Sequence, residues 1–227
     1  MREEIVAIVP AAGVGSRLGQ EVPKQFVDLN GRAVIARTVA NLAWCSRIVV
    51  VHHPDHRELT VRMLDQAGSL PALTLVPGGP TRRLSIAAAL EAISDVPDGA
   101  PVVIQNAASP NTPPSLVAAC VAALETHEMA QAFVPAVHTI FREKDGEMSE
   151  VLQRSTLGYT ADPTAYRLSC LRAIAARQAE DGDEGHMMSD TARAMGTAIR
   201  LVPSPESNLK LTTPNDLILL RHLTAGT

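Results

Sequence analysis

Short apolar runs alternate with helical patterns along the first 135 residues of the chain. Each run is rich in Val, Ile, Leu and Ala and carries no charge, which is typical of strands buried on both faces of a sheet. The runs lie at 5–9, 48–51, 73–76, 102–104 and 132–135. Apolar residues at helical spacing lie between them, at 34–42, 58–66, 84–93 and 115–124. This alternation predicts an α/β fold, with a mostly parallel sheet covered by helices on both faces.

The alternation ends near Thr139, where a charged stretch begins. Asp145-Gly146 lies at the centre of this stretch, and Asp-Gly between short apolar flanks is a strong signal for a tight hairpin turn. We therefore expect residues 1–227 to form a single domain from which a β-hairpin arm over 137–160 projects. Further along, the pattern predicts a polar loop over 179–185, a strand over 199–202 and a helix from Pro214.

Composition and charge narrow the function classes. The 227 residues carry a net formal charge of −4, which argues against a nucleic-acid-binding face but leaves room for a small anion held by local cations. No apolar run approaches the ~18 residues of a membrane span. Cys45, Cys120 and Cys170 match no zinc or redox spacing, and we interpret them as structural thiols. We expect a cytoplasmic protein that binds neither nucleic acid nor a membrane.

A glycine-rich turn follows the first predicted strand, and ligands on parallel sheets bind beyond the carboxyl ends of the strands. Residues 10–19 read Pro-Ala-Ala-Gly-Val-Gly-Ser-Arg-Leu-Gly, and Pro-Lys-Gln follows at 23–25. Glycine lets backbone N–H groups approach a phosphate closely. Arg17 and Lys24 add two cations, which suits a triphosphate. A dinucleotide is less well supported, because the spacing departs from G-x-G-x-x-G and the second strand does not end on a ribose-binding acid.

Two further segments carry candidate chemistry. The turn over 77–85 contains Gly78-Gly79 and Arg82 and opens a predicted helix, whose exposed N–H groups attract anions. Near the end of the chain, Lys210 lies in an extended segment before the last helix. A lysine in such a segment, taken alone, is more typical of a surface position than of a catalytic one.

Together, four ordered motifs resemble the 2-C-methyl-D-erythritol 4-phosphate cytidylyltransferase family, whose relatives include ribitol-5-phosphate cytidylyltransferases. The resemblance covers nearly the whole chain. It rests on Pro10-Ala11-Ala12-Gly13-x-Gly15-x-Arg17-x-Gly19, Pro23-Lys24-Gln25, Gly78-Gly79-x-x-Arg82-x-x-Ser85 and Asn208-x-Lys210-x-Thr212-Thr213-Pro214-x-Asp216. It implies a Rossmann-like nucleotidyltransferase sandwich that forms a homodimer through its arm.

The resemblance also implies how the loops would bind CTP together with Mg²⁺. The N–H groups of Gly13 and Gly15 and the side chain of Arg17 would hold the triphosphate. The rest of the CTP site would include Ala11, Ala12, Gly79, Arg82 and Ser85. Lys24 and Lys210 would flank the α-phosphate and would form the catalytic set with Arg17. Mg²⁺, held mainly by the CTP phosphates, and these cations would stabilise the charge that grows as an acceptor phosphate displaces pyrophosphate.

The acceptor side departs from the family pattern. The family's His-Asp-Ala-Ala-Arg-Pro reads Gln105-Asn106-Ala107-Ala108-Ser109-Pro110 here, so one acid and one arginine are missing. The family's Gln-Thr-Pro-Gln is Ala161-Asp162-Pro163-Thr164, its Asp-Thr before the arm is His138-Thr139, and its Thr-Asp-Asp is Ser189-Asp190-Thr191. Asparagine cannot supply the charge of a carboxylate, and serine cannot supply a guanidinium fork.

The resemblance implies that Thr139 and Arg154 hold the phosphate of the acceptor, with the arginine reaching across from a partner subunit. Asn106 and Ser109 would lie against the acceptor's hydroxyl groups or the metal's surroundings. Methylerythritol 4-phosphate is the leading acceptor, and ribitol phosphate, glycerol phosphate or a phosphonate stays open. A nucleotide-binding protein without activity is a further alternative, against which the intact lysines count. A dinucleotide-dependent oxidoreductase is the alternative from another class.

The remaining histidines and acids receive structural interpretations. His52, His53 and His56 cluster without accompanying carboxylates, so they do not indicate a metal site. Asp190 and Asp216 lie where helices are expected to begin, and we interpret them as helix caps.

Overall fold

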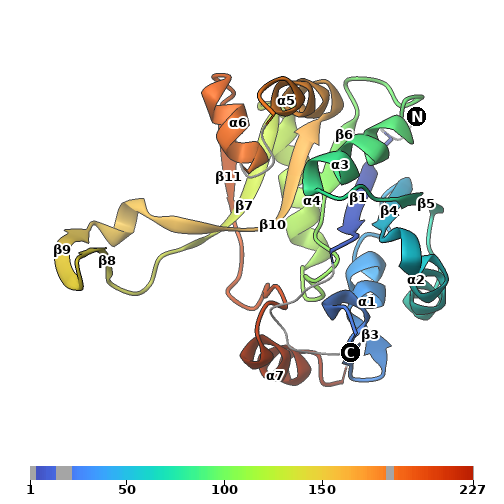
Figure 1. The fold of residues 1–227 in the computed structure, drawn as a ribbon, viewed down its shortest axis with the longest axis horizontal. Coiled ribbons are helices and arrows are strands. Elements are labelled where there is room, and N and C mark those ends of the chain that lie inside the picture. Colours follow the sequence, from blue (N-terminus) through green and yellow to red (C-terminus); the bar gives the residue numbers. More distant parts are fainter. Residues whose placement is uncertain (1–3, 14–21, 183–186, 227) are drawn as a thin grey trace.

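A seven-stranded sheet forms the centre of the computed structural model, which describes residues 4–13, 22–182 and 187–226 (Figure 1). The order across the sheet is β11-β7-β10-β6-β1-β4-β5. The strands are β1 (Val6–Ala11), β4 (Arg47–His52), β5 (Ala72–Pro77), β6 (Pro101–Ile104), β7 (Met129–Pro135), β10 (Gly158–Arg167) and β11 (Ile199–Pro203). β10 is antiparallel to both of its neighbours, and the other pairs are parallel. The mostly parallel α/β sheet expected from the sequence is confirmed.

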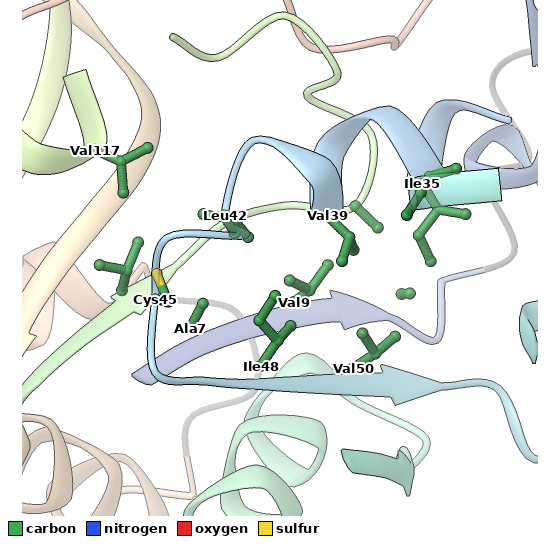
Figure 2. Packing of buried hydrophobic residues seen from close by; sticks show 14 of the residues in the cluster. Ala7, Val9, Ile35, Val39, Leu42, Cys45, Ile48, Val50 and Val117 are labelled. Carbon is green, nitrogen blue, oxygen red and sulfur yellow. The ribbon is translucent and has the colours of Figure 1, made fainter. Parts of the chain in front are cut away.

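Successive residues of β1 pack on opposite faces of this sheet. Ala7 and Val9 join a buried cluster with α1 (Val34–Ala40) and α4 (Pro114–Ala122). Val6 and Ile8 join a second cluster with α3 (Arg82–Glu91) and α5 (Leu168–Glu180). Figure 2 shows part of the first cluster, where side chains of α1 face those of β1 and β4. Burial on both faces explains why this strand has no polar position.

The helices predicted in the first half of the chain are present, with ends shifted by a few residues. Besides α1, α3 and α4, the structure has α2 (Arg57–Leu64), which continues as a 3-10 turn over Asp65–Ala67. The last helix, α7 (Pro214–Leu223), begins at the predicted residue. Its side chains form a third buried cluster that includes Leu29, which lies in a small hairpin of β2 (Asp28–Leu29) and β3 (Arg32–Ala33). No described helix is long and apolar enough to cross a bilayer.

The prediction of a polar loop over 179–185 is wrong at its start, because α5 continues to Glu180. Arg177 Nε donates to Asp181 Oδ2 over 2.7 Å on the exposed face of this helix. Gln178 Nε2 donates over 3.1 Å to the hydroxyl of Thr191, which lies on α6 (Met188–Ala194). The polar residues before 181 therefore occupy faces of a helix. A helix was expected to begin near Asp190, but the N-cap residue is Met187 and no side chain caps the helix, so the capping role expected for Asp190 is wrong. Residues 183–186 lie outside the described residues.

The sequence pattern also does not predict β10, which contains Asp162-Pro163, joined by a cis peptide bond. Its pairing with β7 shifts register between Thr160 and Thr164, and such a bulge redirects side chains. Gln131 of β7 spans the irregularity: its Nε2 donates to the Ala161 carbonyl over 2.7 Å, and its Oε1 accepts from the Thr164 hydroxyl over 3.0 Å.

The predicted arm is a two-stranded hairpin, β8 (Ile140–Lys144) and β9 (Glu147–Leu152), which projects away from the sheet (Figure 1). Asp145 and Gly146 form its turn with φ of 55° and 84°. Two positive φ values characterise the type I′ turn, for which Asp-Gly is a preferred pair.

Candidate active site

A cavity of about 260 Å³ lies at the carboxyl edge of the parallel strands β1, β5 and β6. Nine of the residues that the sequence singled out line it: Ala11, Ala12, Gly13, Lys24, Gly79, Arg82, Ser85, Asn106 and Lys210. Gly15 and Arg17 lie outside the described residues. The cavity therefore gathers segments that are almost 200 positions apart in the chain, from Ala11 to Lys210.

The two glycine-rich turns touch because one position has no side chain. A Cβ on Gly78 would lie 2.6 Å from Ala12 Cβ and 2.9 Å from Ser85 Oγ. Contacts this short do not occur between real side chains, so only glycine lets the second turn reach the first. The Gly78 N–H also donates to the His52 carbonyl over 2.8 Å, which ties the turn to the end of β4.

Gln25 holds the beginning of the first turn in place. Its side chain is 2% exposed, and Nε2 donates to the carbonyls of Ala11 over 2.8 Å and Gly13 over 3.0 Å. These two bonds fix the carbonyls of Ala11 and Gly13 at the point where the chain leaves β1. This glutamine belongs to the Pro23-Lys24-Gln25 motif, from which no role for it was expected. The feature of the sequence that could have indicated a role for Gln25 is its position next to Lys24 in this motif.

The start of α3 borders the same cavity. The Thr81 hydroxyl caps the helix by accepting from the Leu84 N–H over 3.2 Å. Ser85 is 3% exposed, and its Oγ donates to the Gly79 carbonyl over 3.4 Å. The N–H groups and the positive end of the helix dipole at this end favour an anion.

Lys210 reaches the cavity because its neighbours are anchored. The Leu211 N–H donates to the Ala108 carbonyl over 2.8 Å, and the Leu211 side chain is fully buried in the cluster beneath α7. Asp216 Oδ2 accepts from the N–H groups of Thr212 and Thr213 over 2.9 and 2.7 Å. The Asp216 N–H donates in turn to the Thr213 hydroxyl over 3.4 Å, which completes a capping box at the start of α7, so the expected capping role of Asp216 is confirmed. The exposed lysine thus extends from a rigid turn.

A chain of buried side chains joins this turn to the loop after β6. Gln105 Nε2 donates to the Thr112 hydroxyl over 2.9 Å, and that hydroxyl donates to Asn208 Oδ1 over 2.8 Å. Asn208 Nδ2 donates in turn to the Asp162 carbonyl over 2.6 Å. The motif asparagine therefore connects three loops by hydrogen bonds.

The positions that depart from the family pattern contact one another. Asn106 Nδ2 donates to Asp162 Oδ1 and the Ser109 hydroxyl donates to Asp162 Oδ2, both over 2.5 Å. Arg82 donates to Asn106 Oδ1 over 2.9 Å. A second cavity, of about 440 Å³, adjoins the first and shares Arg82, Asn106 and Lys210 with it. Asp162 departs from the family pattern, but its place in the site was not expected from the sequence, because the contact depends on β10.

Thr139 and Arg154 lie elsewhere in the single chain. Both are exposed at the base of the arm, and Arg154 donates to the Val137 carbonyl over 3.0 Å. Neither lines the two cavities. A role for them at the acceptor phosphate stays a prediction that needs a partner subunit.

The described histidines and cysteines lie outside the cavity of about 260 Å³. The described residues contain no group of three or more His, Cys, Asp or Glu that could hold a metal ion, and His52 contacts the His53 carbonyl through Nδ1 over 2.8 Å. Burial raises the pKa of Cys45 and of Cys120 to about 12, which keeps both thiols protonated and unreactive. The three cysteines are free.

The family model described as IspD, 2-C-methyl-D-erythritol 4-phosphate cytidylyltransferase, matches residues 5–223. The chain belongs to this cytidylyltransferase family. It is 35% identical over 227 residues to the 2-C-methyl-D-erythritol 4-phosphate cytidylyltransferase of Cereibacter sphaeroides, covering 96% of each chain. It is 37% identical over 212 residues to the bifunctional enzyme IspD/IspF of Rhodobacter capsulatus, covering 93% of this chain and 54% of that protein. The chain thus spans about half of the bifunctional relative.

The fold agrees with this cytidylyltransferase assignment. The crystal structure of 4-diphosphocytidyl-2C-methyl-D-erythritol synthase from Anaerococcus prevotii superimposes with a TM-score of 0.83, at 19% identity, covering 98% of this chain and 99% of that one. Because the chain belongs to this family, the alternative function of a dinucleotide-dependent oxidoreductase has no support. Members of the family are nucleotidyltransferases, and the cavity at the carboxyl edge of the sheet holds the nine motif residues in one place.

Proposed function

We propose that this protein transfers CMP from CTP to 2-C-methyl-D-erythritol 4-phosphate and releases pyrophosphate. The observation that carries the proposal is the cavity at the edge of β1, β5 and β6, which is lined by all the described residues that the resemblance assigns to CTP. Backbone amides and cations line it, which suits an anionic nucleotide.

The reaction follows from the groups at this cavity. An oxygen of the acceptor phosphate attacks the α-phosphorus of CTP, a new P–O bond forms, and the bond to the bridging oxygen breaks as pyrophosphate leaves with its electron pair. The acceptor phosphate is already a nucleophile, so no general base is needed. Lys24 and Lys210 border the same cavity and stabilise the negative charge on the equatorial oxygens. Arg17 completes this proposed catalytic set.

Mg²⁺ is the proposed cofactor, and it would offset the negative charge of the CTP phosphates. No Asp or Glu is among the described residues that line the 260 Å³ cavity. This lining fits an ion that is held mainly by the triphosphate and water, as Mg²⁺ commonly is at nucleotide sites.

The second candidate function is transfer of CMP to a different acceptor. The contact of Asn106 and Ser109 with Asp162 favours this function. This contact replaces the acid and the arginine that the family pattern carries after β6. A changed acceptor, such as ribitol phosphate, glycerol phosphate or a phosphonate, would account for the replacement without disturbing the CTP side.

We propose that the protein works as a homodimer joined through its arms. The hairpin projects from the sheet, and Phe141, Met148 and Val151 on it are 47%, 59% and 61% exposed. An isolated two-stranded hairpin is marginally stable in water, so apolar side chains on it call for a covering surface. A second copy would supply that surface and would let Arg154 reach the partner's acceptor site. Three free cysteines agree with the cytoplasm as the proposed location.

Pyrophosphate release in the presence of Mg²⁺ tests the proposal. CTP is offered with methylerythritol 4-phosphate, ribitol 5-phosphate, glycerol 3-phosphate or a phosphonate, and ATP, GTP and UTP serve as controls. We expect turnover with CTP and methylerythritol 4-phosphate. Turnover with another acceptor alone would establish the second candidate. CTP binding without product, for every acceptor, would identify a nucleotide-binding protein without activity.

A further inference from the structure

Asp162 has a carboxylate held by side chains from another loop. Asn106 and Ser109, both on the loop after β6, each donate to a different oxygen of it over 2.5 Å. Its backbone is also fixed, because Asn208 donates to its carbonyl and Gln131 donates to the carbonyl of the preceding residue. Such a side chain has little rotational freedom left, which is a requirement for selecting a ligand by geometry.

The contacts also determine the orientation of Asn106. A guanidinium group only donates and a carboxylate only accepts, so Oδ1 of the amide must face Arg82 and Nδ2 must face Asp162. An aspartate at position 106 could not make the second of these bonds and would bring two negative charges together. The amide at 106 and the acid at 162 are therefore matched to each other.

The carboxylate also faces the larger cavity. Asp162 lines the 440 Å³ cavity together with Arg82, Asn106, Ser109 and Lys210. An ionised carboxylate can accept about four hydrogen bonds. Asn106 and Ser109 donate two of them, so about two acceptor positions remain for a ligand. Arg82 and Lys210 border both cavities, which puts positive charge where an acceptor phosphate would approach CTP.

We propose that Asp162 determines acceptor specificity by accepting hydrogen bonds from hydroxyl groups of the phosphorylated polyol. The same charge disfavours acceptors that carry a carboxylate at that position. This inference rests on the proposed cytidylyl transfer and adds to it a residue that selects the acceptor.

The first experiment is steady-state kinetics of Asp162→Asn, with CTP and with the acceptor that the wild-type protein turns over fastest. We expect the acceptor KM to rise about 10- to 100-fold, because hydrogen bonds to a charged group are lost. The CTP KM should stay within about twofold, because Asp162 does not line the smaller cavity. Glu91→Gln, which removes one negative charge from an exposed position at the far end of α3, is the matched control and should behave as wild type.

The second experiment compares two competitors of the acceptor that differ in one group. Glycerol 3-phosphate carries a hydroxyl where 3-phosphoglycerate carries a carboxylate. Wild type should bind the first more tightly. Asp162→Asn should reduce that preference about tenfold, since removal of the like charge relieves repulsion of the second.

A reciprocal exchange keeps the inference testable if a single variant folds poorly. Asn106→Asp should lower kcat/KM for the acceptor, because two carboxylates then face each other. Asp162→Thr should also lower kcat/KM for the acceptor, because the acid at this position is lost. The double variant again has one acid between these loops. Its kcat/KM for the acceptor should exceed that of each single variant by about tenfold. If the double variant loses as much kcat/KM as the two single losses combined, the proposed match between Asn106 and Asp162 is overturned.

The outcomes separate the inference from the function beneath it. If wild type turns over none of the acceptors, the proposed function fails and the role of Asp162 fails with it. If wild type is active and Asp162→Asn keeps the acceptor KM, only the inference is overturned. An increased requirement for Mg²⁺ with an unchanged acceptor KM would also overturn it, because the carboxylate would then serve the metal.

Discussion

The backbone N–H of Leu211 donates to the carbonyl of Ala108 over 2.8 Å, and this bond connects the segment before α7 to the loop after β6. Both residues are buried in the third hydrophobic cluster, at 0% and 3% exposure. Lys210 and Ala107 flank this bond, and both line the smaller cavity. A lysine that looked like a surface residue in the sequence thus lies beside a proposed nucleotide site.

Replacement of Lys210 tests the catalytic role inferred from this position. Lys210→Ala should lower kcat about 100-fold or more, because a preorganised charge at the transition state is lost. The same loss is expected for Lys24→Ala. CTP binding measured by calorimetry should weaken much less than kcat falls.

Arg62→Ala, at an exposed position on α2, is the control for loss of a cation and should keep wild-type rates. A Lys210→Ala variant with a normal kcat would remove this lysine from the mechanism. A large fall in CTP affinity with an unchanged kcat would assign it to ground-state binding only.

Gly78→Ala tests the contact between the two glycine-rich turns. The added methyl would lie 2.6 Å from Ala12 Cβ, so the turns must separate. We expect the free energy of unfolding to fall by about 1–3 kcal/mol and the CTP KM to rise. Gly99→Ala is the matched control: nothing lies within 4 Å of the added methyl, and a change of no more than about 0.5 kcal/mol is expected. Equal melting temperatures for the two variants would contradict the close approach.

Mixed dimers test whether Arg154 serves the partner subunit. Arg154→Ala and Lys24→Ala subunits are each expected to be nearly inactive. If the arginine acts across the interface, each mixed dimer contains one intact site, and random mixing restores about a quarter of wild-type activity. If Arg154 acts within its own chain, no dimer in the mixture has an intact site, and activity should stay at the level of the separate variants.

Burial of two thiols predicts slow labelling and a loss of stability in alkali. The pKa of Cys45 and of Cys120 rises from 9.0 in the unfolded reference to about 12 in the folded chain. Their contribution to stability is therefore complete below pH 9 and declines as the pH rises from 9 towards 12, because only the unfolded chain releases these protons in that range. Iodoacetamide at pH 8, followed by mass spectrometry, should label both residues only after urea unfolding. Rapid labelling of the native protein at Cys45 would contradict this burial.

The hydrophobic pattern was sufficient for the parallel strands and for the helices between them, and insufficient for other elements, among them α5, β10 and α6. β1 and β4 are continuous apolar runs because both faces of each strand are buried, so local composition reports their environment directly. β10 mixes polar residues with a proline and pairs with strands whose sequences lie up to about 60 positions away, and no local pattern reports such pairing. α6, at seven residues, is too short for periodicity to identify.

The sequence by itself determined the α/β class and the hairpin turn at Asp145-Gly146, because turn chemistry and strand ends are local properties. The resemblance was needed to add Lys210 to the residues that line the cavity. The tertiary structure alone decided that Gln25 holds the carbonyls of the first turn and that Asp162 lies between Asn106 and Ser109. The physical reason is the same in both cases. A hydrogen bond needs two atoms within about 3 Å of each other, and only the packing of strands and loops brings residues 12 positions apart, such as Gly13 and Gln25, or 56 positions apart, such as Asn106 and Asp162, to that distance.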